Sequence, residues 1–141
     1  VLRHRTRPAT LEEAEQLHIA PAAPVIELRR LRGMDGYPIC VDLVVLRREG
    51  LEPMVTADMT DQSLYERLEA LCGVRLQRSA YSVQADAADA EIAQLLGCPV
   101  GAPILVGSEV AYTADNQPVL VGVNRYRGDA YRFRAELFRP A

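Results

Sequence analysis

The chain contains no lysine and no tryptophan, and aromatic residues make up only 6% of its 141 residues. Apart from two histidines, its cationic side chains are therefore all arginines, yet the formal net charge is −3. Nucleic-acid binding needs clustered excess positive charge, so this composition argues against DNA or RNA binding by the chain itself. No apolar run approaches the ~20 residues that a transmembrane helix requires, and we expect no membrane partner.

Cysteine is also scarce. Cys40, Cys72 and Cys98 are far apart, odd in number and without the spacing of a metal site. Each has apolar neighbours, which predicts buried, reduced thiols in a cytoplasmic protein. His4 and His18 have no companion ligands, so the sequence indicates no zinc site, and we expect neither a metal nor another cofactor.

The length and composition suit a single domain. A chain of 141 residues with 49% hydrophobic residues can bury one core. No internal repeat, low-complexity tract or interior linker divides it, so we expect residues 1–141 to form one domain. The chain begins at Val1 without a methionine, and we expect it to have been cut from a longer protein.

Turn and cap signals divide the chain into short strands and helices. Thr10 with Glu13, and Ser63 with Glu66, form capping-box patterns typical of helix starts, and the turn signal at 34–36 joins two strands in a hairpin. Predicted helices cover residues 10–18, 63–72 and 86–96, and predicted strands cover 1–7, 24–33, 37–48, 74–85, 103–113, 118–127 and 131–138. This order predicts an α+β fold, an antiparallel β-sheet with helices packed on one side.

Arg30 and Arg32 are the most informative pair of residues. They occupy alternate positions of the predicted strand 24–33, so they share one face with Ile26 and Leu28. Arginine is rarely placed on a buried face unless an anion meets it, and its planar guanidinium binds carboxylate or phosphate bidentately. We therefore interpret the chain as a small-molecule sensor with an anionic ligand.

Three further residues have both a structural and a functional interpretation. Asp42 either forms a cross-strand ion pair with Arg30 or Arg32 that binds nothing, or it orients an arginine or accepts a hydrogen bond from a ligand. Ser63 caps a helix, and the free N–H groups of the same helix start suit an anion. Tyr65 either lines a pocket or is a surface aromatic residue.

The sequence gives little support to catalysis. Tyr126, Arg127 and Asp129 lie between the last two predicted strands, where a turn with a solvated ion pair is the commoner interpretation. No nucleophile–base pair, glycine-rich phosphate loop or metal cluster is evident in the sequence. We therefore expect a protein that is not an enzyme.

Taken in order, these motifs resemble the UTRA domain, the effector-binding half of HutC-type regulators in the GntR family of bacterial transcription regulators. The resemblance is carried by Arg30, Arg32, Asp35, Gly36, Pro38, Ser63, Tyr65, Pro118, Tyr126, Arg127, Gly128, Asp129 and Tyr131. It implies a chorismate-lyase-like α+β fold and a homodimer. It also implies a winged helix-turn-helix DNA-binding domain upstream, which is absent from this chain.

The resemblance further implies roles for individual residues. The anionic group of the ligand would be held at Arg30, Arg32, Ser63 and Tyr65, and the rest of the pocket would be lined by Asp42 and Tyr126. Effector binding would change the placement of the two DNA-reading heads in the dimer. The expected moving parts are helix 63–72 and the irregular stretch 51–61 that precedes it.

Two positions depart from the family pattern. Asp42 is one methylene shorter than the glutamate commonly found there. Leu120 lies two residues after Pro118, where relatives often carry an acidic residue that would bind sugar hydroxyls. We therefore predict a ligand with one acidic group and a less polar body, and not an N-acetylamino-sugar phosphate.

Two alternatives compete with the sensor hypothesis. A chorismate-lyase-like enzyme would also use arginines to hold carboxylates, and it would release 4-hydroxybenzoate from chorismate. A dimerisation module with a vestigial pocket would pair its arginines only with Asp42 and Glu109, and no metabolite would raise its melting temperature. The surroundings of the two arginines are therefore the decisive feature.

Overall fold

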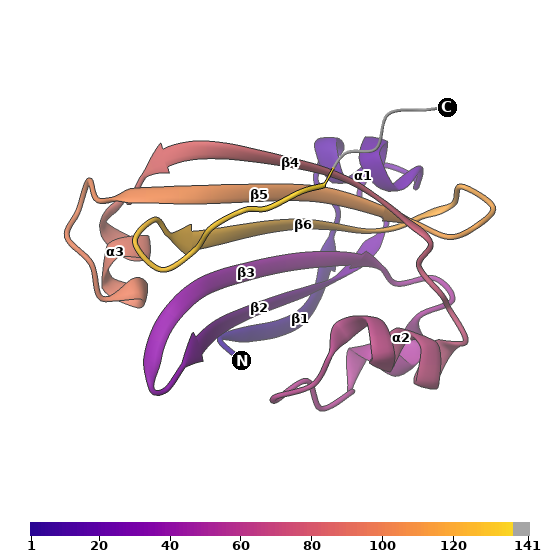
Figure 1. Ribbon diagram of the computed structural model, residues 1–141. Helices are drawn as coiled ribbons and strands as arrows, with labels where there is room; N and C mark the ends of the chain where they lie inside the picture. Colours follow the sequence, from indigo (N-terminus) through magenta and orange to yellow (C-terminus); the bar gives the residue numbers. More distant parts are fainter. Residues whose placement is uncertain (137–141) are drawn as a thin grey trace.

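The computed structural model describes residues 1–136, which form a six-stranded antiparallel sheet covered by short helices (Figure 1). The strands are β1 (Arg3–Pro8), β2 (Pro24–Met34), β3 (Tyr37–Arg47), β4 (Arg78–Ala87), β5 (Pro103–Tyr112) and β6 (Pro118–Arg127). The helices are α1 (Leu11–Leu17), α2 (Leu64–Cys72), α3 (Ala90–Leu96) and the 3-10 helix η1 (Glu52–Val55). The strand order is β1-β2-β3-β6-β5-β4. The predicted α+β class with an antiparallel sheet is confirmed.

The hairpin of β2 and β3 carries three of the predicted site residues. Its turn residues Asp35 and Gly36 have positive φ angles of 53° and 81°, the backbone that a two-residue type I′ turn requires. The register places Arg30 opposite Asp42 and Arg32 opposite Cys40. Because directly opposed residues share a face, all four side chains start from the same side of the sheet.

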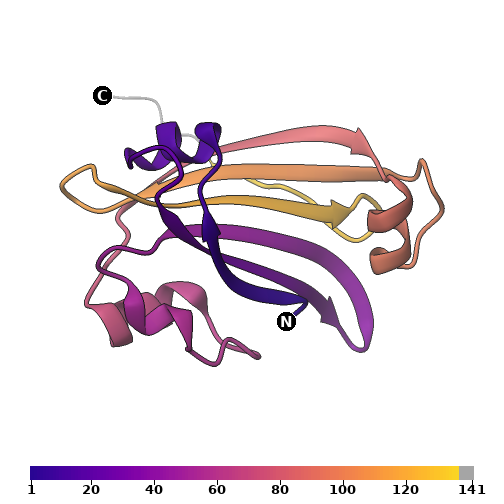
Figure 2. The ribbon, with the colours of Figure 1, turned by 180° about the vertical axis from the view of Figure 1, so that it is seen from behind.

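Helices cover both faces of the sheet, as the two opposite views show (Figures 1 and 2). One face, here called the α2 face, packs α2 and η1 against Ile26, Leu28, Val44, Leu46 and Leu120. The opposite face, here called the α1 face, packs α1 against Val25, Val45 and Val121, and α3 against Val41 and Ile104. The arrangement thus differs from the expected packing on one side. Strand β3 explains the difference, because its residues 43–46 are all apolar and present apolar side chains to both faces.

Caps fix where the helices begin. The predicted capping box between Thr10 and Glu13 is present at α1, and Ser63 caps α2 by accepting from the N–H of Glu66. Helix α3 begins later than predicted, because Asp89 caps it while residues 86 and 87 still pair with β5. The α-helices of residues 1–136 span only seven to nine residues, and none of them is long and apolar enough to cross a membrane.

The predicted strand 131–138 is irregular over residues 131–136, and Phe138 lies outside the described residues. Within residues 1–136, β5 and β6 are already paired along both edges, so this segment has no open neighbour there. It crosses the α2 face in front of these strands instead (Figure 1). Tyr131 stacks on Tyr126 with 3.8 Å between ring centroids, and Phe133 stacks on Tyr81 at 6.0 Å.

Candidate functional site

A cavity of about 530 Å³ lies on the α2 face, between the sheet and the first turn of α2. Several residues with charged or hydroxyl groups line this cavity. They include Arg30, Arg32, Asp42, Ser63, Tyr65 and Glu109. Five of the six residues predicted from the sequence therefore line one cavity. They come from the β2–β3 hairpin and from the start of α2, which follows β3 only after η1 and the loops around it.

Arg30 has no carboxylate partner within residues 1–136. Its Nη1 donates to the backbone carbonyls of Gln62 at 2.8 Å and Met59 at 3.4 Å, and its Nε is buried without a partner. Burial lowers the pKa of Arg30, and the positive charge of Arg32 lowers it further, although the Asp42 carboxylate opposes both effects. Arg30 is thus a half-buried, partly desolvated cation at the cavity wall.

Arg32 is already neutralised by a carboxylate. Its Nε forms a close ion pair with Oδ2 of Asp42, and its Nη2 donates to Oδ1 of Asp42 at 3.2 Å. Asp42 is only 4% exposed, whereas the side chain of Arg32 is 50% exposed. Burial alone would lower the pKa of Arg32, but the neighbouring Asp42 leaves it raised. The bidentate contact is a cross-strand ion pair, and it fits both interpretations of Asp42 given above, a purely structural pair and a residue that orients an arginine.

Cys40 and Tyr126 surround this ion pair. The thiol of Cys40 donates to Oδ1 of Asp42 at 3.0 Å, and burial together with the Asp42 charge raises the pKa of Cys40 to about 12. Nη2 of Arg32 donates to the hydroxyl oxygen of Tyr126 at 3.5 Å. Tyr126 therefore touches Arg32, but it is not among the residues that line the cavity.

Ser63 and Tyr65 place the start of α2 at the cavity. The Ser63 hydroxyl accepts from the N–H of Glu66 at 3.4 Å, and residues 63–65 all line the cavity. The first N–H groups of a helix carry partial positive charge and lack intrahelical acceptors, so this position favours an anion. The cation of Arg30 and this helix start therefore favour the same kind of ligand group.

Glu109 on β5 is a cavity residue that the sequence analysis did not include in the site. Its Oε2 accepts from the Ser79 hydroxyl at 2.6 Å and from the Tyr65 hydroxyl at 3.4 Å. Burial, and then the Glu109 charge, raises the pKa of Tyr65 to about 12. A signal was available, because Glu109 alternates with Gly107 and Ala111 on one face of its strand. An acidic residue between two small ones on an inward face indicates a functional position.

Leu120 lies elsewhere than expected. It is fully buried, packs in the core beneath α2, and does not line the cavity. The expectation that Leu120 contacts the ligand in place of an acidic residue is wrong, because the β3–β6 register pairs it with Leu46 in the core. The prediction of a less polar ligand body therefore loses the residue on which it was based.

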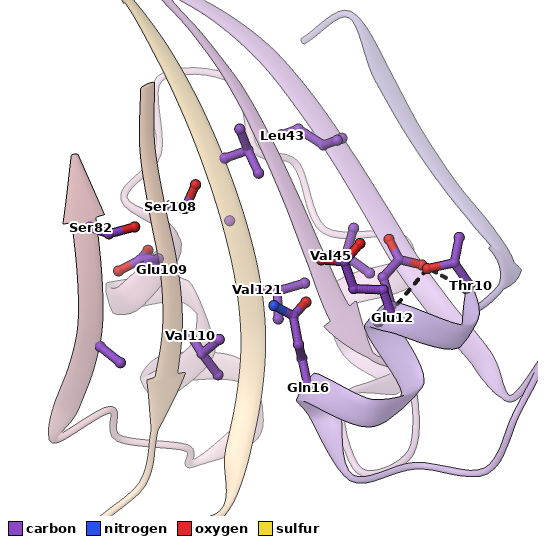
Figure 3. Close-up of a pocket in the computed structure, with 14 residues that line it drawn as sticks. Thr10, Glu12, Gln16, Leu43, Val45, Ser82, Ser108, Glu109, Val110 and Val121 are labelled. Atoms are coloured by element: carbon purple, nitrogen blue, oxygen red, sulfur yellow. Dashed lines mark hydrogen bonds between the residues drawn. The ribbon is translucent and has the colours of Figure 1, made fainter. Parts of the chain in front are cut away.

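A second hollow of about 480 Å³ lies on the α1 face, between α1 and the central strands (Figure 3). Its lining includes Glu12 and Gln16 of α1 and apolar or hydroxyl side chains of the sheet, and it contains no arginine. Glu109 is also among the residues around this hollow, but its Oε2 is hydrogen-bonded to Tyr65 and Ser79 on the α2 face. The α1 hollow thus lacks the positive charge that an anion requires.

Within residues 1–136, no three His, Cys, Asp or Glu side chains gather in a way that could hold a metal ion. The three cysteines are unpaired thiols, with Cys40 buried and the other two half-buried. The polar groups around the cavity are guanidinium, carboxylate and hydroxyl groups together with the amides of Gln62 and Asn124. These groups bind and orient small polar molecules through charge and hydrogen bonds.

The fold is that of a regulator's ligand-binding domain. The structure superposes on the ligand-binding domain of a GntR-family transcriptional regulator from Bordetella bronchiseptica with a TM-score of 0.90. The two chains are 28% identical, and the match covers 97% of this chain and 86% of the other. The chain belongs to the UTRA domain family, whose model matches residues 1–132.

Other relatives are also transcriptional regulators. The chain is 30% identical to the HTH-type transcriptional regulator Rv0792c of Mycobacterium tuberculosis, over 99% of this chain and 52% of that protein. It thus spans about half the length of the curated relatives it matches. The fold is also that of PhnF from Mycobacterium smegmatis, with a TM-score of 0.93 and 23% identity, covering 99% of this chain and 61% of that one.

Proposed function

We propose that this chain is the sensing domain of a bacterial transcription regulator and that it binds a small anionic metabolite in the cavity on the α2 face. The observation that carries the proposal is Arg30. It is a desolvated guanidinium beside a helix start, with no carboxylate partner among residues 1–136. A half-buried cation without a carboxylate partner gains most from an anion that arrives with the ligand.

The residues around Arg30 divide the work of binding. The ligand anion would contact Arg30, the N–H groups at the start of α2, and the hydroxyls of Ser63 and Tyr65. Asp42 would hold Arg32 in place as a second, partly neutralised donor. Tyr126 would act one step away from the ligand, through its contact with Arg32.

Arg30 also offers a route from ligand to conformational change. Its guanidinium holds the backbone carbonyls of residues 59 and 62, which lead directly into α2. An anion that competes for this guanidinium would loosen those two hydrogen bonds and shift α2. A ligand changes a distant equilibrium only through its differential affinity for two arrangements, typically by ~1–3 kcal/mol.

The remaining parts of the proposal concern the whole regulator. We propose that the domain works as a homodimer in the cytoplasm, that DNA is bound by a separate upstream winged helix-turn-helix domain, and that the chain has no catalytic role. The relatives support this, because they are transcriptional regulators of about twice this length. Incubation with chorismate should therefore release no 4-hydroxybenzoate.

A thermal-shift screen tests the proposal directly. The wild-type chain and an Arg30→Ala variant would be heated with inorganic phosphate, sugar phosphates, alkyl phosphates and small carboxylates. An anion at 100 times its dissociation constant should stabilise the wild type by about 2.7 kcal/mol. Arg30→Ala should lose this shift. Arg48→Ala is the matched control, because Arg48 is exposed and does not line the cavity.

Two results would contradict the proposal. The first is that no anion in the screen shifts the wild type, which would favour a vestigial pocket. The second is that Arg30→Ala responds like the wild type, which would place the binding site elsewhere. Titration calorimetry on the best compound should give one site per chain, lost in Arg30→Ala and kept in Arg48→Ala.

A further inference from the structure

The cavity on the α2 face contains a carboxylate, that of Glu109, which a purely anionic ligand would not contact favourably. Glu109 lines the cavity, and it makes no ion pair within residues 1–136. Its Oε2 is occupied by the hydroxyls of Ser79 and Tyr65, whereas its Oε1 accepts no hydrogen bond from the described residues. Two hydroxyl donors hold this carboxylate in place, and its free Oε1 can accept a hydrogen bond from a cationic group.

The sheet beneath Glu109 leaves room for this group. Gly122 is directly opposite Glu109 in the β5–β6 pairing. A Cβ atom at Gly122 would lie 3.4 Å from Cγ and 3.6 Å from Oε1 of Glu109, so the carboxylate rests over a position without a side chain. The acidic side chain therefore lies along the cavity floor, and not in a crowded core.

The two ends of the cavity carry opposite charge. Arg30 lies on β2 and Glu109 on β5, and the sheet places β3 and β6 between these strands (Figure 1). Three strand intervals correspond to roughly 14 Å between the two backbones, part of which the side chains cover. Between them, the Asp42 carboxylate is already bound by Arg32. Asp61 also borders the cavity, but it lies on the exposed loop before α2.

We propose that the ligand of this cavity is a zwitterion, with an acidic group bound at Arg30 and a protonated amine bound at Glu109. This inference rests on the proposed function, and it names the class of ligand more closely. The amine and the acid would be at opposite ends of the molecule, because two strands, β3 and β6, lie between the strands that carry the two charged residues. Glu109 is then the residue that selects amines over neutral groups.

Calorimetric titration with matched probes tests the inference. The probes are n-alkyl phosphates and ω-aminoalkyl phosphates of equal chain length, titrated into the wild-type chain at neutral pH. The aminoalkyl phosphates should bind the wild type about tenfold to a hundredfold more tightly than the alkyl phosphates, as expected for a charge-assisted hydrogen bond. The preference should be greatest for the longer chains, which reach both ends.

Two variants separate the amine site from the anion site. Glu109→Gln keeps an oxygen that can accept from Ser79 and Tyr65, so it should fold normally; it should lose the amine preference and keep its affinity for alkyl phosphates. Glu49→Gln removes the same charge from an exposed position outside the cavity, and it should behave like the wild type.

Each remaining outcome is decisive. Equal binding of the two series by the wild type would overturn the amine site while leaving the anion sensor intact. A preference that persists in Glu109→Gln would also overturn it, because another group would then bind the amine. Failure of both series to bind the wild type would remove the anion site, and with it the zwitterion.

Discussion

Two buried carboxylates lie on neighbouring strands of the sheet, and their surroundings differ. Glu27 on β2 is 5% exposed and lies within ion-pair distance of Arg3, Arg5 and Arg7 on the α1 face. Asp42 on β3 is 4% exposed and is paired on the α2 face only with Arg32, among residues 1–136. Glu27 would keep two arginine partners if one were removed, whereas Asp42 would lose its one ion pair.

The arginines of the two faces differ in the same sense. Arg7 bonds both carboxylate oxygens of Glu13, and this contact raises the pKa of Arg7 despite its burial. Burial lowers the pKa of Arg30, although the charge of Asp42 opposes this effect, and within residues 1–136 the hydrogen-bond partners of Arg30 are backbone carbonyls. On the α1 face, the arginines and the carboxylates of Glu13 and Glu27 pair with one another without any ligand. On the α2 face Arg30 has no carboxylate partner among residues 1–136, so a ligand anion can still pair with it.

The largest expected effect comes from removing the single partner of Asp42. Arg32→Ala leaves a buried carboxylate with only the Cys40 thiol and should lower the free energy of unfolding by about 3 kcal/mol. Arg5→Ala should cost less than about 1 kcal/mol, because Glu27 keeps two arginines. Urea denaturation measures both values. Adding Asp42→Asn to Arg32→Ala should recover part of the loss, and the comparison fails if the two single variants are equally stable.

A second test exchanges charge for an apolar side chain of similar length. Arg7→Met removes a bidentate contact and should cost about 2 kcal/mol. Arg30→Met loses two bonds to carbonyls but also ends the desolvation of an unpaired cation, so it should cost less than about 1 kcal/mol. Both values come from denaturant curves without ligand. A larger loss for Arg30→Met would mean that Arg30 is chiefly a structural residue.

The pH dependence should come mainly from the α1 face. The hydrogen bonds from Arg7 lower the pKa of Glu13 below its ordinary value of 4.5. Burial would raise the pKa of Glu27, but its bond with Arg5 and the charges of Arg7 and Arg3 lower it overall. A carboxylate with a lowered folded-state pKa contributes stability above its unfolded pKa, and this stability is lost as the pH falls through the folded value.

The wild type should therefore lose stability as the pH drops below about 4.5. Arg7→Ala should be less stable at pH 7 and should lose less on acidification, because Glu13 then titrates closer to its unfolded value. Denaturant curves at a series of pH values check this. Arg48→Ala is a suitable control, and an acid limb unchanged in Arg7→Ala would show that other groups dominate.

The smallest expected effect concerns the helix caps. Thr10 takes part in a reciprocal box at α1, with bonds of 3.1 Å and 2.9 Å, whereas the Ser63 bond at α2 is 3.4 Å long. Thr10→Ala should cost about 1 kcal/mol, and Ser63→Ala about half of that. Thermal unfolding without ligand compares them. A larger loss of stability in Ser63→Ala than in Thr10→Ala would mean that Ser63 stabilises α2 more than its 3.4 Å hydrogen bond indicates.

Much of the site could be predicted from the sequence because it follows from strand periodicity. The alternation that places Arg30 and Arg32 on one face is local. The turn at Asp35 and Gly36 closes the hairpin, but the register shift between Arg32 and Gly33 is what sets Asp42 opposite Arg30, and no sequence signal predicted that shift. The cap at Ser63 is also a local signal. Five predicted residues lie around one cavity for these reasons.

The remaining features depend on contacts between distant segments. Glu109 reaches the cavity because β5 pairs with β6, not because of its sequence neighbours. Leu120 was misplaced because its position along the α2 face follows from the β3–β6 register, which sets it opposite Leu46 in the core and away from the cavity. The segment 131–136 has strand-like residues, yet β3, β4 and β6 already occupy the neighbouring edges. Periodicity assigns a residue to a face, but only the pairing of strands decides what lies on that face.

The aromatic side chains near the cavity have a practical consequence for measurement. Tyr65 contacts Glu109, and Tyr126 and Tyr131 stack at 3.8 Å beside Arg32. Because the chain has no tryptophan, its near-ultraviolet absorption and emission come from tyrosine. A molecule that binds beside these rings changes their surroundings and hence the tyrosine signal, and no tryptophan signal masks this change. The protein thus carries its own optical reporter of occupancy, and no dye or label is needed.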